Sequence, residues 1–320
     1  MIVHSRAKIL IASILIFASR AAFAHEADAP QSFHALIRDW EFDPLVIAGL
    51  VLSACLYLRG VRRLWKVVGV NVGIKKWEAV CFGVGWLFTA IALVSPLHAW
   101  GEALFSAHMV QHEILMLIAA PLFVLGRPMI AFLKALSGKW AGQLARFGNS
   151  FWWQKFWRVV TYPLNAWIIH AVALWAWHIP FLFQATLESD FVHSLQHSSF
   201  LFSALLFWWA LMHGRARMRG YGIAVLYVFT TAMHTGALGA LITFAGSILY
   251  PAYASTAPAW HLTPLEDQQL GGLIMWIPAG LVYVVAGLAL FAAWLRESEA
   301  RVELYEAELS RDQTFKFPNA

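Results

Sequence analysis

The chain has 320 residues, of which 60% are hydrophobic and only 13% are charged, and its mean hydropathy is +0.62. A soluble domain carries roughly 25% charged residues, so this composition excludes a soluble protein and indicates an integral membrane protein in a lipid bilayer. The net charge of +5 does not indicate nucleic-acid binding, because the basic residues fall between apolar segments, where they face anionic lipid.

The first 24 residues have the pattern of a secretory signal peptide. Arg6 and Lys8 form a basic start, residues 9–18 an apolar core, and Ala22-Phe23-Ala24 a cleavage site. The core is too short to cross a bilayer, so we predict a cleaved signal peptide over residues 1–24. Residues 25–42 are then periplasmic, and an uncleaved anchor would leave them on the same side.

Seven apolar segments follow, most of them near the roughly 20 residues needed to cross hydrocarbon. They are expected at residues 44–58, 79–97, 104–126, 163–178, 193–213, 222–249 and 271–295. The predicted fold is therefore all-α, a polytopic seven-helix bundle over residues 43–296. A charged cytoplasmic tail is expected over residues 297–320.

The distribution of Lys and Arg predicts the orientation of these segments. Basic residues fill the connections after the first, third, fifth and seventh segments, and none occurs after the second, fourth or sixth. By the positive-inside rule, the N-terminus lies outside and the C-terminus in the cytoplasm. The long connection of residues 127–158 also contains four tryptophans, a composition typical of a segment in the membrane interface.

Two His-x-x-x-His pairs open the third and fifth segments, namely His108/His112 and His193/His197. Residues four apart share one face of a helix, so each pair offers two imidazole nitrogens to one metal ion. With the predicted topology, both pairs lie in the outer leaflet, together with His98 and His178. The sequence predicts a metal site there, and it leaves open whether the two pairs face each other.

Three further residues are predicted to take part in this site. Met116 continues the spacing of His108 and His112 by another four residues, and imidazole with thioether suits Cu(I) better than zinc. Glu113 is the one acidic residue inside a predicted span and would support an imidazole N–H. Asp267 would add an outer carboxylate, although it could instead cap a helix.

The remaining polar and small residues of the spans have simpler interpretations. His170, His213 and His261 are expected to form hydrogen bonds rather than to bind metal. Gly236, Gly239 and Gly246 are expected to allow close helix packing. Cys55 and Cys81 fall within or beside apolar spans, so we predict no disulfide between them.

A series of motifs runs in order through residues 40–296. It includes Ser95-Pro96-Leu97, His108 to His112, His193 to His197, Leu249-Tyr250-Pro251 and Asp267 to Gly272. Together these motifs resemble the multi-spanning CtaG family of cytochrome c oxidase assembly factors. The resemblance implies a bacterial inner-membrane protein that is not an enzyme and that helps to mature a haem-copper oxidase. Its implied partners are an oxidase subunit and a periplasmic copper chaperone.

The leading hypothesis joins the two arguments. Cu(I) would arrive from the periplasm, be held between the third and fifth spans, and pass to an oxidase subunit. The alternatives are a haem-bearing redox protein with axial histidines, a zinc hydrolase in which Glu113 or Asp267 activates water, and a scaffold without metal.

Overall fold

The structure is a computed structural model that describes residues 40–136, 138–214, 218 and 220–316, with side chains as far as Glu306. The predicted signal peptide and residues 25–39 of the predicted periplasmic segment lie outside the described residues. Every element within them is helical. In chain order these are α3 (Pro44–Val68), α4 (Lys76–Val94), α5 (Leu97–Ala103), α6 (Phe105–Glu113), the π-helix η1 (Ile114–Ala119), α7 (Ala120–Gly126), α8 (Pro128–Ala135), α9 (Gly138–Gly148), α10 (Phe151–Val160), α11 (Pro163–Trp177), α12 (Pro180–Glu188), α13 (Asp190–His213), α14 (Tyr221–Thr243), the 3-10 helices η2 (Pro251–Ala254) and η3 (Ala257–Trp260), and α15 (Pro264–Lys316).

Six helical stretches are long and apolar enough to cross a membrane, namely α3, α4, the continuous run from α6 to α7, α13, α14 and α15. A seventh forms if α10 and α11 are taken as one span bent by 68°. Pro163 begins α11, where its missing N–H costs no helical hydrogen bond. The predicted all-helical membrane protein is confirmed, while its orientation stays a prediction.

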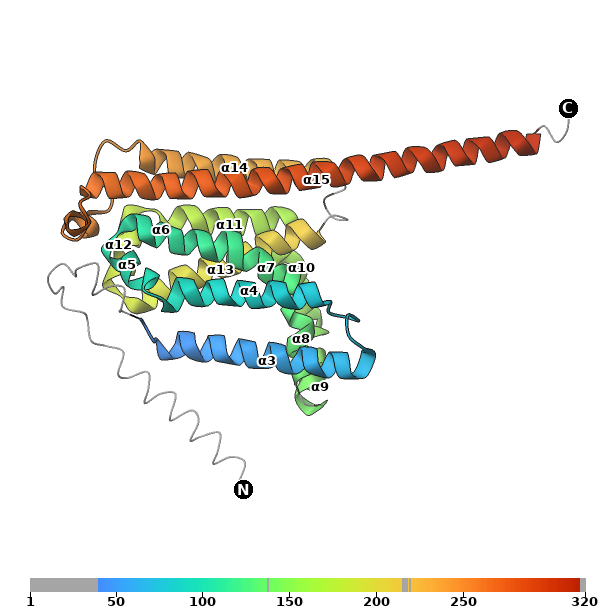
Figure 1. Cartoon of the computed structure of the whole chain (residues 1–320), viewed down its shortest axis with the longest axis horizontal. Helices are drawn as coiled ribbons and strands as arrows, with labels where there is room; N and C mark the ends of the chain where they lie inside the picture. The colour runs from blue at the N-terminus through green and yellow to red at the C-terminus, as the bar shows by residue number, and fades with distance from the viewer. Residues whose placement is uncertain (1–39, 137, 215–217, 219, 317–320) are drawn as a thin grey trace, which may run out of the picture.

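Three spans differ from the predicted ones by more than three residues at one or both ends. Helix α3 does not end near residue 58 but continues to Val68, because Val61 and Leu64 bury an apolar face against α8. Helix α14 ends at Thr243, and a loop with η2 and η3 replaces the predicted end of that span. Helix α15 begins seven residues earlier than predicted and continues as one helix through most of the charged tail (Figure 1).

The helices that carry the histidine pairs lie at the centre of the bundle. Figure 1 shows α3 along one edge and α14 with α15 along the other, with α6, α7 and α13 between them. In the apolar stretches, 56% of residues are buried for α6 to α7 and 50% for α13, against 22% for α3 and 17% for α15. The histidine pairs therefore belong to the protein interior rather than to the lipid-facing surface.

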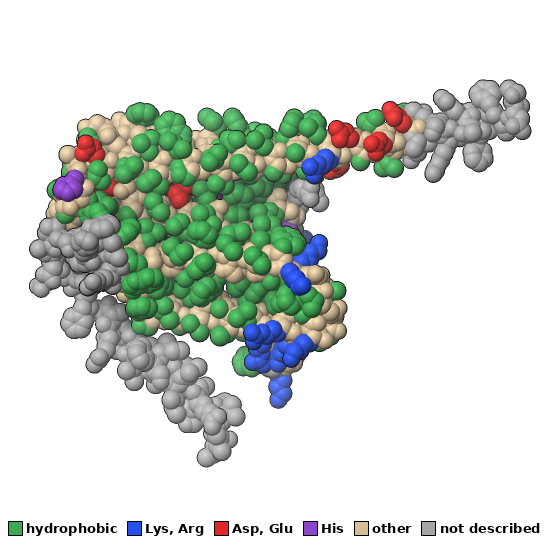
Figure 2. Space-filling view, viewed as in Figure 1, with side chains coloured by type: hydrophobic (Ala, Val, Ile, Leu, Met, Phe, Trp, Pro, Cys, Tyr) green, Lys and Arg blue, Asp and Glu red, His purple; other side chains and the backbone are tan. Residues whose placement is uncertain are grey.

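The two ends of the bundle differ in their content of basic residues. Hydrophobic side chains cover its long sides, and Lys and Arg gather at the end where α8 and α9 lie (Figure 2). Helices α8, α9 and α10 run across that end rather than along the bundle, and no side chain of α9 or α10 is buried (Figure 1). This arrangement agrees with a segment in the membrane interface. Helices α5 and α12 lie at the opposite end.

Helices α14 and α15 approach each other closely at glycines. A Cβ atom on Gly272 would lie 2.7 Å from the carbonyl oxygen of Gly239 and 2.5 Å from Oγ1 of Thr243. Gly236 and Gly239 both face Trp276 of α15, as predicted for close packing. Gly246 lies beyond the end of α14 and has nothing within 4 Å of its Cβ position, so the prediction of helix packing at Gly246 is wrong.

We expect Gly272→Ala to lower the free energy of unfolding by about 1–3 kcal/mol, because the added methyl group would push the two helices apart. Gly280→Ala in the same helix is the matched control, since a Cβ there meets nothing within 4 Å. Thermal unfolding in detergent would measure both. Equal melting temperatures for the two variants would contradict the close approach at Gly272.

Candidate metal centre

Six histidines form one cluster at the end of the bundle opposite α8 and α9. They come from α5, α6, the C-terminus of α11 and the first turns of α13, and we call them the histidine cluster: His98, His108, His112, His178, His193 and His197. The ring centroids lie 5.0 Å apart between His108 and His193 and 5.2 Å apart between His112 and His197. The two predicted pairs therefore face each other, which the sequence had left open.

The spacing of four residues brings the rings of each pair together, as predicted. The centroids are 4.4 Å apart both for His108 with His112 and for His193 with His197. His98 stacks on His193 with centroids 5.1 Å apart, and His178 lies 6.2 Å from His112. All six are held by helices or by helix ends, so the positions of the rings are set by the packing of the bundle.

Three of these imidazoles are placed to share one ion. One ring nitrogen each of His108, His193 and His197 lies within 4.8 Å of the others, and all three residues are buried. Neutral imidazole nitrogens are ligands for copper and zinc. The donor set therefore fits a transition metal, with small side-chain movements to close the coordination shell.

Many ring nitrogens of the cluster have no hydrogen-bond partner among the described residues. Both nitrogens of His112 are buried and unpartnered, and so is Nε2 of His178, His193 and His197. A buried polar atom without a partner costs roughly 1–3 kcal/mol. Five such atoms in one place are explained if a metal ion takes up some of their lone pairs.

A second set of donors lies at the solvent side of the cluster. His98, Glu102 and His193 also hold donor atoms within 4.8 Å of one another. The side chain of His98 is 14% exposed and that of Glu102 is 52% exposed, so this set opens outward. His193 belongs to both sets.

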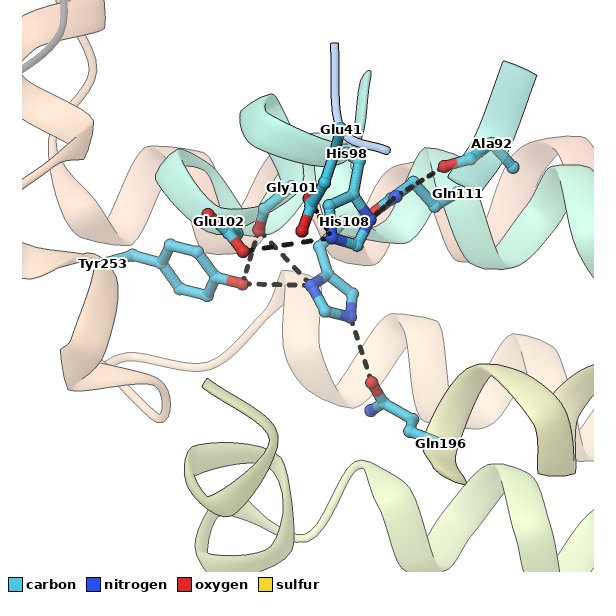
Figure 3. A network of polar contacts seen from close by, with 9 residues as sticks. All are labelled: Glu41, Ala92, His98, Gly101, Glu102, His108, Gln111, Gln196 and Tyr253. Carbon is cyan, nitrogen blue, oxygen red and sulfur yellow. Dashed lines mark hydrogen bonds and ion pairs between the residues drawn. The ribbon is translucent and has the colours of Figure 1, made fainter. Parts of the chain in front are cut away.

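His98 is held by acidic residues at this mouth (Figure 3). Its Nε2 lies 2.8 Å from Oε2 of Glu41, and Nε2 of Gln111 donates to its Nδ1 over 3.2 Å. Burial alone would lower the pKa of His98, but the hydrogen bond to Glu41 and the carboxylates of Glu41, Glu102 and Asp190 outweigh it and raise that pKa. The mouth therefore favours positive charge.

His108 has partners on both sides of its ring (Figure 3). Its Nδ1 lies 3.3 Å from the carbonyl oxygen of Gly101, and its Nε2 lies 3.1 Å from Oε1 of Gln196, so both ring nitrogens face oxygen atoms that accept hydrogen bonds. The hydroxyl of Tyr253 donates to the same carbonyl over 3.0 Å and lies 3.3 Å from Nδ1. A metal ion bound at Nε2 would displace Oε1 of Gln196, and Nδ1 would then carry the proton and donate it toward the Gly101 carbonyl.

The predictions missed three of these supporting residues. Gln111 and Gln196 each precede the second histidine of a pair, so both pairs read His-x-x-Gln-His. The glutamine shared by the two pairs could have indicated from the sequence that Gln111 and Gln196 support the histidines. Tyr253 lies in η2, where no sequence pattern pointed to it. Burial, together with the carboxylates of Asp267 and Glu102, raises the pKa of Tyr253, so its hydroxyl keeps its proton.

Asp267 belongs to α15, and its carboxylate reaches the first turn of α6 rather than the imidazoles. Its carboxylate accepts hydrogen bonds from the backbone N–H groups of Phe105 (2.7 Å) and Ser106 (3.1 Å) and from the Ser106 hydroxyl (2.5 Å). Asp267 thus caps α6 across the bundle, while Thr263 and Glu266 form the capping box of its own helix. A role as metal ligand would compete with this cap.

Met116 and Glu113 also lie apart from the histidine cluster. Both line a separate small cavity together with His170. His170 forms a hydrogen bond with Ser203 over 3.1 Å, as predicted. His213 packs on Trp209 with ring centroids 4.2 Å apart, and His261 ends η3 in a left-handed conformation. The two cysteines are free thiols, also as predicted.

Comparison with known proteins identifies the protein family to which this chain is similar. The model of the family described as cytochrome c oxidase caa3 assembly factor (Caa3_CtaG) matches residues 55–297. Uncharacterized proteins of Mycobacterium bovis and Mycobacterium tuberculosis are 26% identical over 289 residues, and one of Mycobacterium leprae is 25% identical over 283. Each match covers 85% of this chain but only 42% of the relative, so the chain spans less than half the length of these relatives. No solved structure matches the chain.

Proposed function

Because the chain belongs to the family of cytochrome c oxidase caa3 assembly factors, we propose that it helps to mature a haem-copper oxidase by carrying Cu(I) at its histidine cluster. The cargo is the copper ion, and its receiver is an oxidase subunit in the same membrane. The family match favours an assembly factor over the zinc hydrolase and the haem-bearing redox protein. In this role the protein catalyses no reaction of its own.

One observation supports the copper step most strongly, namely the convergence of buried imidazoles whose ring nitrogens lack partners. His108, His193 and His197 offer three nitrogens within 4.8 Å, from two different helices. Keeping so many polar rings inside an apolar bundle is costly without a task. Copper is favoured over zinc by the family match to an oxidase assembly factor.

The two overlapping donor sets support stepwise loading. An ion captured at the mouth by His98, Glu102 and His193 could move inward by exchanging His98 and Glu102 for His108 and His197, while His193 stays bound. No step then requires a bare ion. The carboxylates of the mouth attract the cation, and imidazoles release it more readily than a cage of thiolates would.

The predicted topology places this mouth on the periplasmic side of the inner membrane. Helix α5, which carries His98 and Glu102, lies at the end of the bundle opposite α8 and α9 (Figure 1). Lys and Arg gather at the end of α8 and α9 (Figure 2), and basic ends face the cytoplasm. Cu(I) would then come from a periplasmic copper chaperone and leave laterally toward the oxidase. The short helix α5 and the loop with η2 and η3 surround the mouth and would form its contact surface.

Deletion and complementation test this proposal in a bacterium that depends on a caa3-type oxidase. We expect deletion to remove oxidase activity in membranes and to lower the copper content of the purified oxidase. Added copper should partly restore both, because a delivery step can be bypassed by mass action. Loss of activity with a normal copper content in the oxidase would overturn copper delivery and leave a scaffold.

Tyr253→Phe is expected to weaken Cu(I) binding about 10–100-fold without unfolding the protein, since residues that orient a ligand contribute about this much. The phenol oxygen of Tyr253 lies 3.3 Å from Nδ1 of His108. Competition with a chromogenic Cu(I) chelator would measure the change. Tyr227→Phe is the matched control, because the Tyr227 hydroxyl donates its hydrogen bond to the Phe207 carbonyl oxygen, away from the histidine cluster. Equal affinities in the two variants would contradict a supporting role for Tyr253.

A further inference from the structure

A small cavity lies further along α6 than the histidine cluster, where α6 and η1 meet α11, α14 and α15. Its volume is about 10 Å³, which is room for about one water molecule or one metal ion. Four side chains that line it carry metal-ligating atoms: Glu113, Met116, His170 and Met275. These residues come from the third span, α11 and α15, so tertiary packing assembles this set.

The two methionines distinguish this cavity from an ordinary hydrated one. Met116 and Met275 are both buried and are two of the eight methionines in the chain. A thioether accepts hydrogen bonds only weakly and is a poor ligand for hard cations, but it binds Cu(I) well. Two thioethers and one imidazole therefore form a donor set for Cu(I).

His170 presents the correct tautomer for such a ligand. The Ser203 hydroxyl donates its one proton to the carbonyl oxygen of Phe200 over 3.2 Å. It must therefore accept from Nδ1–H of His170, 3.1 Å away. This leaves the lone pair of His170 on Nε2. Metal-binding histidines commonly fix their tautomer by such a hydrogen bond from the other ring nitrogen.

Glu113 supplies the charge that a monovalent cation would need in hydrocarbon. Its Oε2 is buried and has no hydrogen-bond partner among the described residues. A carboxylate and a monovalent cation cancel each other's charge, which lowers the cost of holding either one inside the membrane. Glu113 directly follows His112 in the chain, so α6 carries residues of both the cavity and the histidine cluster.

Two helices connect the histidine cluster to the cavity. Helix α11 presents His178 to the cluster and Leu174 and His170, one and two turns away, to the cavity. In the third span, His112 belongs to the cluster and Met116 lines the cavity. Met116 follows His112 by one helical turn, which is about 5–6 Å along the helix axis. The π-helix η1 starts directly after Glu113, and Trp208 donates to the Met116 carbonyl over 2.9 Å, which fixes the backbone beside the cavity.

We propose that this cavity is a second, inner Cu(I) site, in which Met116, Met275 and His170 bind the ion and Glu113 balances its charge. The inference rests on the proposed copper function and adds a storage position to it. Copper held at the histidine cluster would move one to two helical turns inward. The protein then carries two copper ions in unlike surroundings, an outer one bound by nitrogen ligands and an inner one bound partly by sulfur.

The test is Cu(I) loading of the purified full-length protein under anaerobic, reducing conditions, followed by copper analysis and copper X-ray absorption. We expect about two copper ions per chain and a sulfur shell in the absorption spectrum. Met116→Leu combined with Met275→Leu should lose one copper and the whole sulfur shell. Leucine nearly matches methionine in volume, so the fold should persist. Glu113→Gln should weaken the same site only.

Met233→Leu is the matched control, because Met233 is 58% exposed on α14, and it should keep both coppers and the sulfur shell. A wild-type protein with one copper, no sulfur shell and loss of that copper in the variant His193→Ala plus His197→Ala would overturn the inner site and leave the proposed function intact. A wild-type protein that binds no copper at all would overturn both.

Discussion

His193→Ala combined with His197→Ala is expected to remove copper from the histidine cluster and to abolish oxidase maturation. These residues supply two of the three buried nitrogens that lie within 4.8 Å of one another. Structural zinc sites with four ligands bind their ion with about 10–16 kcal/mol, or roughly 3 kcal/mol per ligand. By this measure the loss of two ligands should lower the copper affinity about 10⁴-fold. Copper analysis of the purified variant and oxidase activity in a complemented deletion strain would measure the two effects.

His213→Ala is the control for this experiment. His213 is a membrane-helix histidine of the same type, but it lies at the far end of α13 and packs on Trp209. It should keep normal copper content and complement fully. A doubly substituted protein that binds as many copper ions as the wild type would contradict a metal site at the histidine cluster. Zinc in place of copper in the wild-type protein would favour the hydrolase alternative.

Asp267→Ala is expected to lower the free energy of unfolding by about 3 kcal/mol and to weaken copper binding as well. The carboxylate accepts three hydrogen bonds from the first two residues of α6, and its loss leaves buried N–H groups without partners. Hydrogen bonds to a charged group contribute roughly 1.5–3 kcal/mol each, partly offset by relaxation. Because α6 carries His108 and His112, fraying of its first turn would also misplace both rings. Thermal unfolding in detergent and Cu(I) competition would measure the two effects.

Glu266→Ala is the matched control one residue away. Glu266 caps only its own helix, at an exposed position, so its loss should cost about 0.5–1 kcal/mol and leave copper binding unchanged. Asp267→Asn should fall between the two, since the amide oxygen can still accept one of the N–H groups. A stable Asp267→Ala protein with normal copper affinity would show that the cap across the bundle matters little.

Several properties of this protein follow from the sequence alone, because they depend on neighbours along the chain. Apolar stretches long enough to cross a bilayer predicted the helices of the membrane domain, and most of their positions were correct. A spacing of four residues placed His108 beside His112, and His193 beside His197, on one helix face. The motifs also indicated the family that the comparison with known proteins supports.

Other properties depend on the order and rotation of helices in the bundle, which local sequence patterns do not determine. Packing of the third span against α13 made the two pairs face each other. Asp267, 162 residues from Phe105, became a cap for α6 rather than for its own helix. Met116, placed by its spacing with the imidazoles, instead joins Glu113 and His170 in a separate cavity. Local periodicity sets the face on which a side chain lies, whereas only the packed bundle decides what that face meets.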